Sequence, residues 1–299
     1  MKLSVFVVTY NQEKYIRQCL DSILMQQVDF DYEVVIGEDH GTDGTRAICE
    51  EYAAKYPQIR LLPLAENLGV AGNWERVISE CKGEYIAMCE GDDYWTNCNK
   101  LEKQVYLLEC DHSLSGCYHN ASSVDEQGNI KKEKITNPKI QEIKFEDSIL
   151  SWYVPTASLV FRNSNYIKEN MRFLYKYSYV STDRLLIALI AHQGNIKYID
   201  EIMSCYRVHD SAVTAQKNKI EMFQKTIFLF EQMHVFFGCE HDTLFRNAIQ
   251  KWRGVIAKTY WNQRSYCNYI RICIINLASI RSFIEAKTII KNYILFRNR

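Results

Sequence analysis

The sequence predicts an α/β fold: a mostly parallel β-sheet flanked by helices, followed by a helical C-terminal extension. Short apolar runs alternate with segments of helical periodicity over the first hundred residues, and this alternation is typical of right-handed crossovers between parallel strands. A polar cluster follows each of these runs. Beyond residue 210 the periodicity is helical to the end of the chain, and basic side chains accumulate there.

Four strands are predicted in the first hundred residues, each from a short apolar run. They cover residues 3–8, 33–37, 59–64 and 85–89. Apolar pairs at helical spacing follow the first strand up to residue 24, and further helices are predicted over residues 45–56 and 70–81. Because ligands bind at the carboxyl ends of the strands in such sheets, the polar residues after each strand are expected to meet in one crevice.

The pattern changes in the second half of the chain. Residues 116–207 are mixed, with strand-like runs at 158–162 and 196–199 and an apolar helix at 185–191. Residues 131–144 form a polar, lysine-rich connection that we expect to be a loop. We therefore expect a main domain over residues 1–215, with halves 1–110 and 111–215, and an extension over 216–299.

Composition and charge limit the class of protein. The 299 residues are 47% hydrophobic and 24% charged, as in a folded globular protein, and the basic and acidic residues are equal in number. Eleven cysteines without a C-x-x-C pair predict a reducing compartment rather than a disulfide framework or zinc site. Asn11, Glu13 and Lys14 interrupt the first apolar run too early for a signal peptide, and no run reaches the roughly 20 apolar residues that span a bilayer.

Three acids follow the fourth predicted strand directly: Glu90, Asp92 and Asp93. Such a cluster is costly to hold together unless a cation or donor group lies among the carboxylates. Hard oxygen ligands suit Mg²⁺ or Mn²⁺, and these ions suit a phosphate-bearing substrate. A solvated acidic turn is the alternative.

Six motifs occur in the order that a known family places them. They are Val8-Thr9-Tyr10-Asn11, the run from Glu38-Asp39 to Gly44-Thr45, Glu66-Asn67-Leu68-Gly69, Glu90-Gly91-Asp92-Asp93, Ser181-Thr182-Asp183-Arg184 and Tyr206-Arg207-Val208-His209. Over residues 1–215 the chain resembles family 2 glycosyltransferases with the GT-A (Rossmann-like) fold. The resemblance implies that residues 1–110 bind a nucleotide sugar and that residues 111–215 bind the acceptor.

The resemblance also assigns the donor-binding residues. Asp39 is similar to the carboxylate that accepts a hydrogen bond from the nucleobase imide, although an aspartate here also forms turns. Glu90 replaces the first aspartate of the family's D-x-D motif, so it contacts either the ribose or the metal. The other residues that we expect around the donor are Thr9, Tyr10, Asn11, Glu38, Asn67, Asp92 and Arg207.

For the cation, Mn²⁺ or Mg²⁺, the resemblance implies the ligands Asp92, Asp93 and His209, although an isolated histidine is often structural. Arg207 suits the diphosphate through its planar fork of donors. Asp183 matches the acid that removes the acceptor's proton in a single displacement with inversion. The alternative is that Asp183 caps the N-terminus of the helix at 185–191, and the two roles are compatible.

The sequence thus predicts an inverting, metal-assisted glycosyltransferase. The default donor is a uridine diphosphate sugar, and the acceptor is a hydroxyl of a glycan or lipid-linked sugar in bacterial surface polysaccharide synthesis. A catalytically inactive nucleotide-sugar or glycan-binding module is the alternative. The chain lacks the glycine-rich phosphate loops that a nucleotidyltransferase, a Rossmann dehydrogenase or a P-loop enzyme would need.

The C-terminal 49 residues carry ten basic side chains against one acid, Glu285, and are interleaved with aromatic and aliphatic residues. This pattern suits the surface of an anionic membrane, so we expect a cytoplasmic protein held peripherally on the inner face of the cell membrane through residues 251–299. An ordinary helical subdomain with a solvated basic face is the alternative. No recognisable nucleic-acid-binding module is present.

Overall fold

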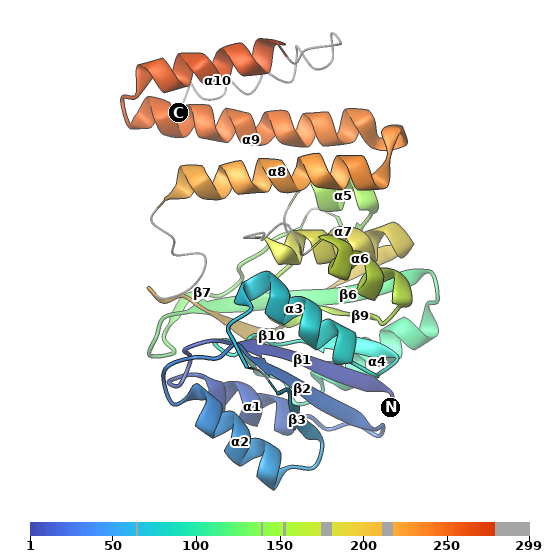
Figure 1. Ribbon diagram of the computed structural model, residues 1–299. Helices are drawn as coiled ribbons and strands as arrows, with labels where there is room; N and C mark the ends of the chain where they lie inside the picture. The colour runs from blue at the N-terminus through green and yellow to red at the C-terminus, as the bar shows by residue number, and fades with distance from the viewer. Residues whose placement is uncertain (64, 139, 152–153, 175–180, 211–217, 279–299) are drawn as a thin grey trace. The chain divides into compact units, whose positions relative to one another are not determined.

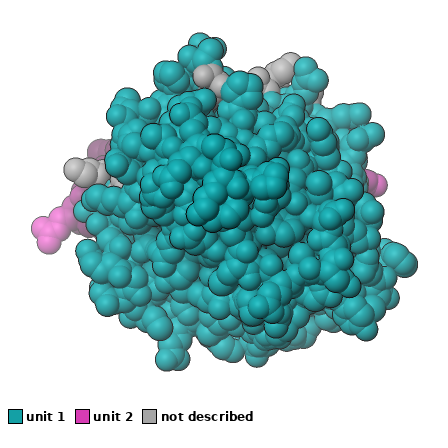
Figure 2. Space-filling view, turned by 90° about the horizontal axis from the view of Figure 1, so that it is seen from below, with its two compact units in different colours: residues 1–178, 182–212 teal, residues 179–181, 213–299 magenta. Residues whose placement is uncertain are grey.

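The computed structural model describes residues 1–63, 65–138, 140–151, 154–174, 181–210 and 218–278. The chain divides into two compact units, which Figure 2 distinguishes by colour: residues 1–178 with 182–212, and residues 179–181 with 213–299. The first unit is built around one mixed sheet, and the second unit is helical (Figure 1). None of the helices in the described part of the chain is long and apolar enough to cross a membrane.

The sheet of the first unit has the strand order β3-β2-β1-β4-β9-β6-β10-β5, with β7 paired to β6 and β8 paired to β10. Its strands are β1 (Leu3–Thr9), β2 (Tyr32–Glu38), β3 (Ile59–Leu61), β4 (Tyr85–Met88), β5 (Tyr94–Trp95), β6 (Leu114–Val124), β7 (Ile130–Lys132), β8 (Glu142–Ile143), β9 (Val160–Arg162) and β10 (Asn195–Arg207). The strands β3, β2, β1 and β4 are parallel to one another, as the alternating sequence pattern predicts. Beyond β4 the sheet is mixed, because β9 runs antiparallel to both β4 and β6 while β10 runs parallel to β6.

Helices cover both faces of this sheet. The first unit contains α1 (Ile16–Leu24), α2 (Thr45–Lys55), α3 (Gly69–Glu80), α4 (Lys100–Cys110), α5 (Phe145–Leu150), the short helix η1 (Thr156–Ser158), α6 (Asn165–Leu174) and α7 (Thr182–Gln193). The second unit contains α8 (Lys219–Phe237), η4 (Cys239–His241), α9 (Asp242–Asn262) and α10 (Tyr266–Ala278). The helical extension expected beyond residue 210 is therefore confirmed over residues 219–278; residues 211–217 and 279–299 lie outside the described residues.

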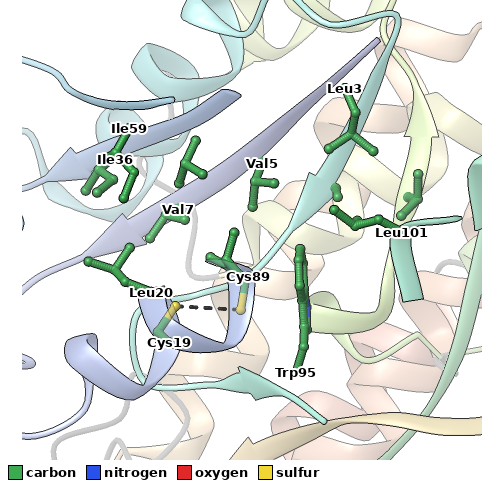
Figure 3. Close-up of a cluster of buried hydrophobic side chains, with 14 of the residues drawn as sticks. Leu3, Val5, Val7, Cys19, Leu20, Ile36, Ile59, Cys89, Trp95 and Leu101 are labelled. Atoms are coloured by element: carbon green, nitrogen blue, oxygen red, sulfur yellow. Dashed lines mark hydrogen bonds between the residues drawn. The ribbon is translucent and has the colours of Figure 1, made fainter. Parts of the chain in front are cut away.

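Alternation along β1 explains the two layers of core. Leu3, Val5 and Val7 point to the face that α1, α2 and α4 cover, and Figure 3 shows them beside Cys19, Cys89 and Trp95. Phe6 points to the other face, where its ring lies 5.1 Å from that of Trp74 on α3. Burying both faces of β1 fixes its register with β2 and β4, and with it the place where its polar end lies.

Two of the differences from the sequence-based prediction have a clear physical reason. The strand predicted over residues 59–64 ends at Leu61, two residues before Pro63, whose nitrogen cannot donate a ladder hydrogen bond; residue 64 lies outside the described residues. The loop predicted over residues 131–144 contains the end of β7 and the whole of β8. Both are short edge strands of polar sequence, which carry too little apolar periodicity to be recognised.

Candidate active site

The polar ends of β1 and β2 lie against each other and against the loop after β3. The backbone N–H of Asp39 donates to the carbonyl of Thr9 across the strand ends, at 3.0 Å. The buried Asp39 carboxylate accepts from the backbone N–H of Leu68 at 2.8 Å, and the Asn67 side chain donates to the Asp39 carbonyl at 2.6 Å. The three clusters predicted to meet after the first three strands are therefore in contact.

Asp39 is the acceptor-bearing side chain of this region. Burial raises the pKa of its carboxyl, opposed by the backbone N–H donors of Leu68 and Gly69 and by the nearby Arg76. One carboxylate oxygen is engaged by Leu68, so lone pairs remain for a further donor such as an imide N–H. The position thus fits both a loop anchor and a recognition group.

Asn11 and Glu38 mainly hold the turn after β2. Asn11 has a left-handed backbone (φ 51°), and its Oδ1 accepts from the backbone N–H of Thr42 at 2.7 Å. The fully buried Glu38 accepts from the backbone N–H of Gly41 at 2.6 Å. Tyr10 is half exposed at the carboxyl end of β1. Of these residues predicted to bind the donor, Tyr10 and Asn11 are therefore exposed to a ligand, whereas Glu38 is not.

The acidic turn after β4 lies beside the end of β1, because Gly91 donates to the Val8 carbonyl at 2.9 Å. A Cβ at Gly91 would lie 2.7 Å from Oγ1 of Thr9 and 2.5 Å from Oε1 of Gln12, so only glycine permits this close approach. Thr9 is accordingly adjacent to the acidic turn as well as to the Asp39 region.

Glu90 points toward η1, where the Thr156 hydroxyl donates to its carboxylate. Burial, and then the charge of Asp92, raise the pKa of Glu90 to about 8; the Thr156 hydroxyl opposes this shift, and the charge of Asp183 adds a smaller contribution. Asp183, almost a hundred residues away in sequence, therefore acts on the acidic turn through its charge.

Asp92 and His209 form the central pair of the site. Nε2 of His209 lies 2.9 Å from Oδ2 of Asp92, and the imidazole is buried against the ring of Tyr15 at 5.1 Å between ring centroids. An imidazole nitrogen and a carboxylate oxygen are both ligand types that Mn²⁺ accepts, although here the two atoms are hydrogen-bonded to each other. Within the described residues no group of three or more His, Cys, Asp or Glu side chains is placed to hold a metal ion. A cation held by this pair would take its remaining ligands from phosphate and water.

Asp93 and Arg207 engage each other and the protein backbone. The buried Asp93 carboxylate accepts from the backbone N–H of Arg207 at 2.9 Å, and burial raises the pKa of Asp93 well above its usual value. The Arg207 guanidinium donates to the carbonyls of Asp92, Asp125 and Glu126 at 3.0–3.2 Å and to Oε1 of Gln18 at 2.6 Å. These contacts tie the acidic turn to the end of β10.

Asp183 lies inside the first turn of α7, which begins at Thr182, and so not at the N-cap position that the sequence suggested as an alternative. Its Oδ1 accepts from the backbone N–H of Arg184 at 2.9 Å. Burial raises the pKa of Asp183, opposed by the charge of Arg184. An acid with a raised pKa is a stronger base when it is ionised, which suits proton removal from a hydroxyl.

Three side chains of the site lie outside the motifs from which the site was predicted. Thr156 contacts Glu90, Gln12 accepts from Thr9 Oγ1 at 2.8 Å, and Tyr15 packs on both His209 and Arg207. Gln12 directly follows Thr9-Tyr10-Asn11, so its position in the chain could have suggested it. Nothing in the mixed sequence around Thr156 points to the acidic turn, since their contact depends on the antiparallel pairing of β9 with β4.

Comparisons with known proteins show which family the chain belongs to. Residues 4–167 match the family described as Glycosyl transferase family 2. A relative in Mycobacterium tuberculosis, described as uncharacterized, is 35% identical over 211 residues; the match covers 69% of this chain and 59% of that protein. The chain thus spans under two thirds of the length of the mycobacterial relatives that it matches.

Two solved structures share the fold. Staphylococcus aureus TarS 1–349 in complex with UDP-GlcNAc superposes with a TM-score of 0.62 at 18% identity, covering 91% of this chain and 90% of that one. The mannosyltransferase PcManGT of Pyrobaculum calidifontis, in complex with GDP-Man and Mn²⁺, superposes with a TM-score of 0.61 at 16% identity, covering 99% and 82%. Both likenesses confirm the GT-A fold expected from the sequence. The family match covers more than half of the chain, and the chain therefore belongs to Glycosyl transferase family 2.

Proposed function

We propose that the chain moves a sugar from a nucleotide diphosphate sugar to a hydroxyl group, by a single displacement that inverts the anomeric centre. One observation supports this proposal above the others: the hydrogen-bonded pair Asp92–His209 adjoins Glu90, and the charges of both Asp92 and Asp183 raise the pKa of Glu90. Such a displacement requires a group that holds the metal-bound diphosphate and a separate group that acts as the base. The Asp92–His209 pair would serve as the first and Asp183 as the second.

The donor is a nucleotide sugar, and we take a uridine diphosphate sugar as the first choice. The fold neighbours were solved with UDP-GlcNAc and with GDP-Man, which supports the class but not the base. The Asp39 carboxylate can accept from the imide N–H of uracil and equally from the N–H groups of guanine. Thr9, Tyr10, Asn11 and Asn67 complete the proposed base and ribose pocket, with Glu38 holding the turn beneath it.

The metal, Mn²⁺ or Mg²⁺, would be held by Asp92 and His209. When bound, it neutralises charge on the diphosphate and so assists departure of the nucleoside diphosphate. We assign positioning roles to Asp93 and Arg207, because the first accepts from the Arg207 backbone and the second donates to backbone and Gln18 oxygens. Glu90, held by Thr156, is adjacent to the Asp92 carboxylate and is proposed to meet the ribose or sugar hydroxyls.

Asp183 would act as the general base. Its carboxylate takes the proton of the acceptor hydroxyl as that oxygen attacks the anomeric carbon, while the bond to the diphosphate breaks on the opposite side. The contact with the Arg184 backbone holds one carboxylate oxygen and leaves the other for the acceptor. We propose a glycan or lipid-linked sugar of a bacterial surface polysaccharide as the acceptor, presented at the inner face of the cell membrane.

Replacing Asp183 by Asn tests the assignment of the base. Asn keeps the volume and the acceptor for the Arg184 N–H but cannot take a proton, so we expect turnover to fall by about 10²–10⁴-fold while donor affinity stays unchanged. Turnover is measured by release of the nucleoside diphosphate with acceptor present, and affinity by calorimetric titration. The matched control is Glu146→Gln, an exposed acid in the first turn of α5. Equal turnover in the Asp183 variant and the parent would remove Asp183 from the mechanism.

A further inference from the structure

Helix α10 exposes an apolar face. Tyr266, Ile270 and Ile274 recur at four-residue spacing and are 50–60% exposed, so they form one stripe along the helix. Ile275 continues the stripe at 40% exposure. The opposite side of α10 packs on α9 and buries Asn276. An ordinary surface helix presents a polar side to water, so an exposed stripe of this kind calls for a partner.

The stripe continues onto the end of α9. Trp261 is 55% exposed, and its ring meets those of Tyr266 and Tyr269 at centroid distances of 5.4 and 5.1 Å, edge to face. An aromatic cluster with apolar bodies and polar N–H and O–H tips suits the boundary between lipid and water. We call Trp261, Tyr266, Ile270, Ile274 and Ile275 the α10 face.

Charge indicates what covers this face. Residues 243–278 contain six basic residues and no acid, and Arg264 and Arg271 beside the face are exposed. Residues 279–299 add five basic residues and one acid to the sequence. A second copy of this helix pair or the C-terminal segment would therefore bring like charge to the face, whereas an anionic bilayer brings opposite charge.

We propose that the α10 face docks on an anionic lipid bilayer, with the isoleucines and aromatic rings at the level of the acyl-chain boundary and Arg264 and Arg271 at the phosphates. The bilayer is contacted from one side and not crossed, since no helix of the described residues is long and apolar enough to span it. The role of the docking rests on the lipid-linked acceptor proposed above; the docking itself does not require that acceptor.

Vesicle sedimentation of the full chain tests the face. At low salt the parent should bind vesicles of phosphatidylcholine with phosphatidylglycerol, and pure phosphatidylcholine vesicles much less. The double substitution Ile270→Glu and Ile274→Glu removes two apolar contacts and adds two repelled charges, so its partition coefficient should fall at least about tenfold. Arg271→Glu should lower partitioning by about tenfold or more. The matched control is Val235→Glu on α8, the substitution of another exposed apolar residue of the second unit, at 81% exposure.

Three results would overturn the docking proposal. One is a parent that ignores anionic vesicles, and another is a double variant that binds them as the parent does. The third is a parent protein that is a dimer and does not bind vesicles, with a double variant that is a monomer. That result would make a second copy of the chain the occupant of the α10 face. Calorimetric titration of nucleotide sugar into the parent and the same variants separates the two proposals. The α10 variants should bind the donor as the parent does. A parent that binds vesicles but no nucleotide sugar would defeat the transferase mechanism and leave the docking proposal standing.

Discussion

At the scale of single residues, the site concentrates acids whose charges oppose one another. Glu90 lies close to Asp92 and Asp183, and burial together with these charges raises the pKa of Glu90 to about 8. In the absence of metal and substrate the Glu90 carboxyl is therefore largely protonated at neutral pH. A bound cation would reverse this balance, because opposite charge favours the ionised form.

The raised pKa of Glu90 predicts how the stability of the metal-free protein changes with pH. Between its usual pKa near 4.5 and the folded value of about 8, the folded state binds more protons than the unfolded state, so this residue's contribution to stability falls as pH rises through that window. Glu90→Gln can still accept from Thr156 and cannot ionise. In EDTA we expect its melting temperature relative to the parent to be higher at pH 8 than at pH 5.

Thermal unfolding at both pH values checks this prediction, with Glu66→Gln, an exposed acid, as the control that should show no such change. If the difference between Glu90→Gln and the parent were the same at pH 5 and pH 8, Glu90 would not titrate in this range and the electrostatic account of the acidic turn would be wrong.

At the scale of elements, Arg207 joins four parts of the first unit. From the end of β10 its guanidinium donates to the acidic turn, to the carbonyls of Asp125 and Glu126 between β6 and β7, and to Gln18 on α1. The rings of Tyr15 and Tyr94 lie 4.8 and 5.3 Å from it. The planar fork suits several acceptors at fixed positions, and a lysine ammonium cannot reproduce it.

Arg207→Lys should therefore lower stability and not only donor affinity. Three backbone carbonyls in partly buried hydrogen bonds lose their donor, which we expect to cost about 2–4 kcal/mol; the melting temperature reports this. The matched control is Arg17→Lys, since the exposed Arg17–Glu51 pair should contribute little to stability. A variant at Arg207 with unchanged melting temperature and weakened nucleotide binding would instead favour the direct phosphate contact predicted from the sequence.

The sequence could not show what the polar groups of Arg207 and Asp93 contact. Motif order predicts both residues at the crevice, after β10 and β4. Their contacts with the chain depend on the backbone N–H of Arg207 and on the carbonyls of Asp125 and Glu126, in a turn that the sequence does not mark as part of the site. Asp92 and His209, both predicted as metal ligands, lie in contact, and their binding of a metal remains a prediction.

At the scale of the whole molecule, periodicity predicted the first half of the sheet and the helical second unit well. Strands β1 to β4 have apolar runs bounded by turns, so their order along the chain and their parallel direction could be predicted. The mixed half could not, because β9 inserts antiparallel between β4 and β6 and carries no mark of direction in its three residues. Thr156 and its contact with Glu90 were missed for this reason.

The measurement that tests the central claim most directly is thermal unfolding of the parent and of Asp92→Asn with a panel of nucleotide sugars, each with Mn²⁺, Mg²⁺ or EDTA. The account predicts that one nucleotide sugar stabilises the parent, by about 2.7 kcal/mol at a hundredfold excess over its Kd, and that EDTA or Asp92→Asn removes the effect. Equal stabilisation of both proteins, with or without EDTA, would contradict a metal-bound diphosphate at Asp92 and His209.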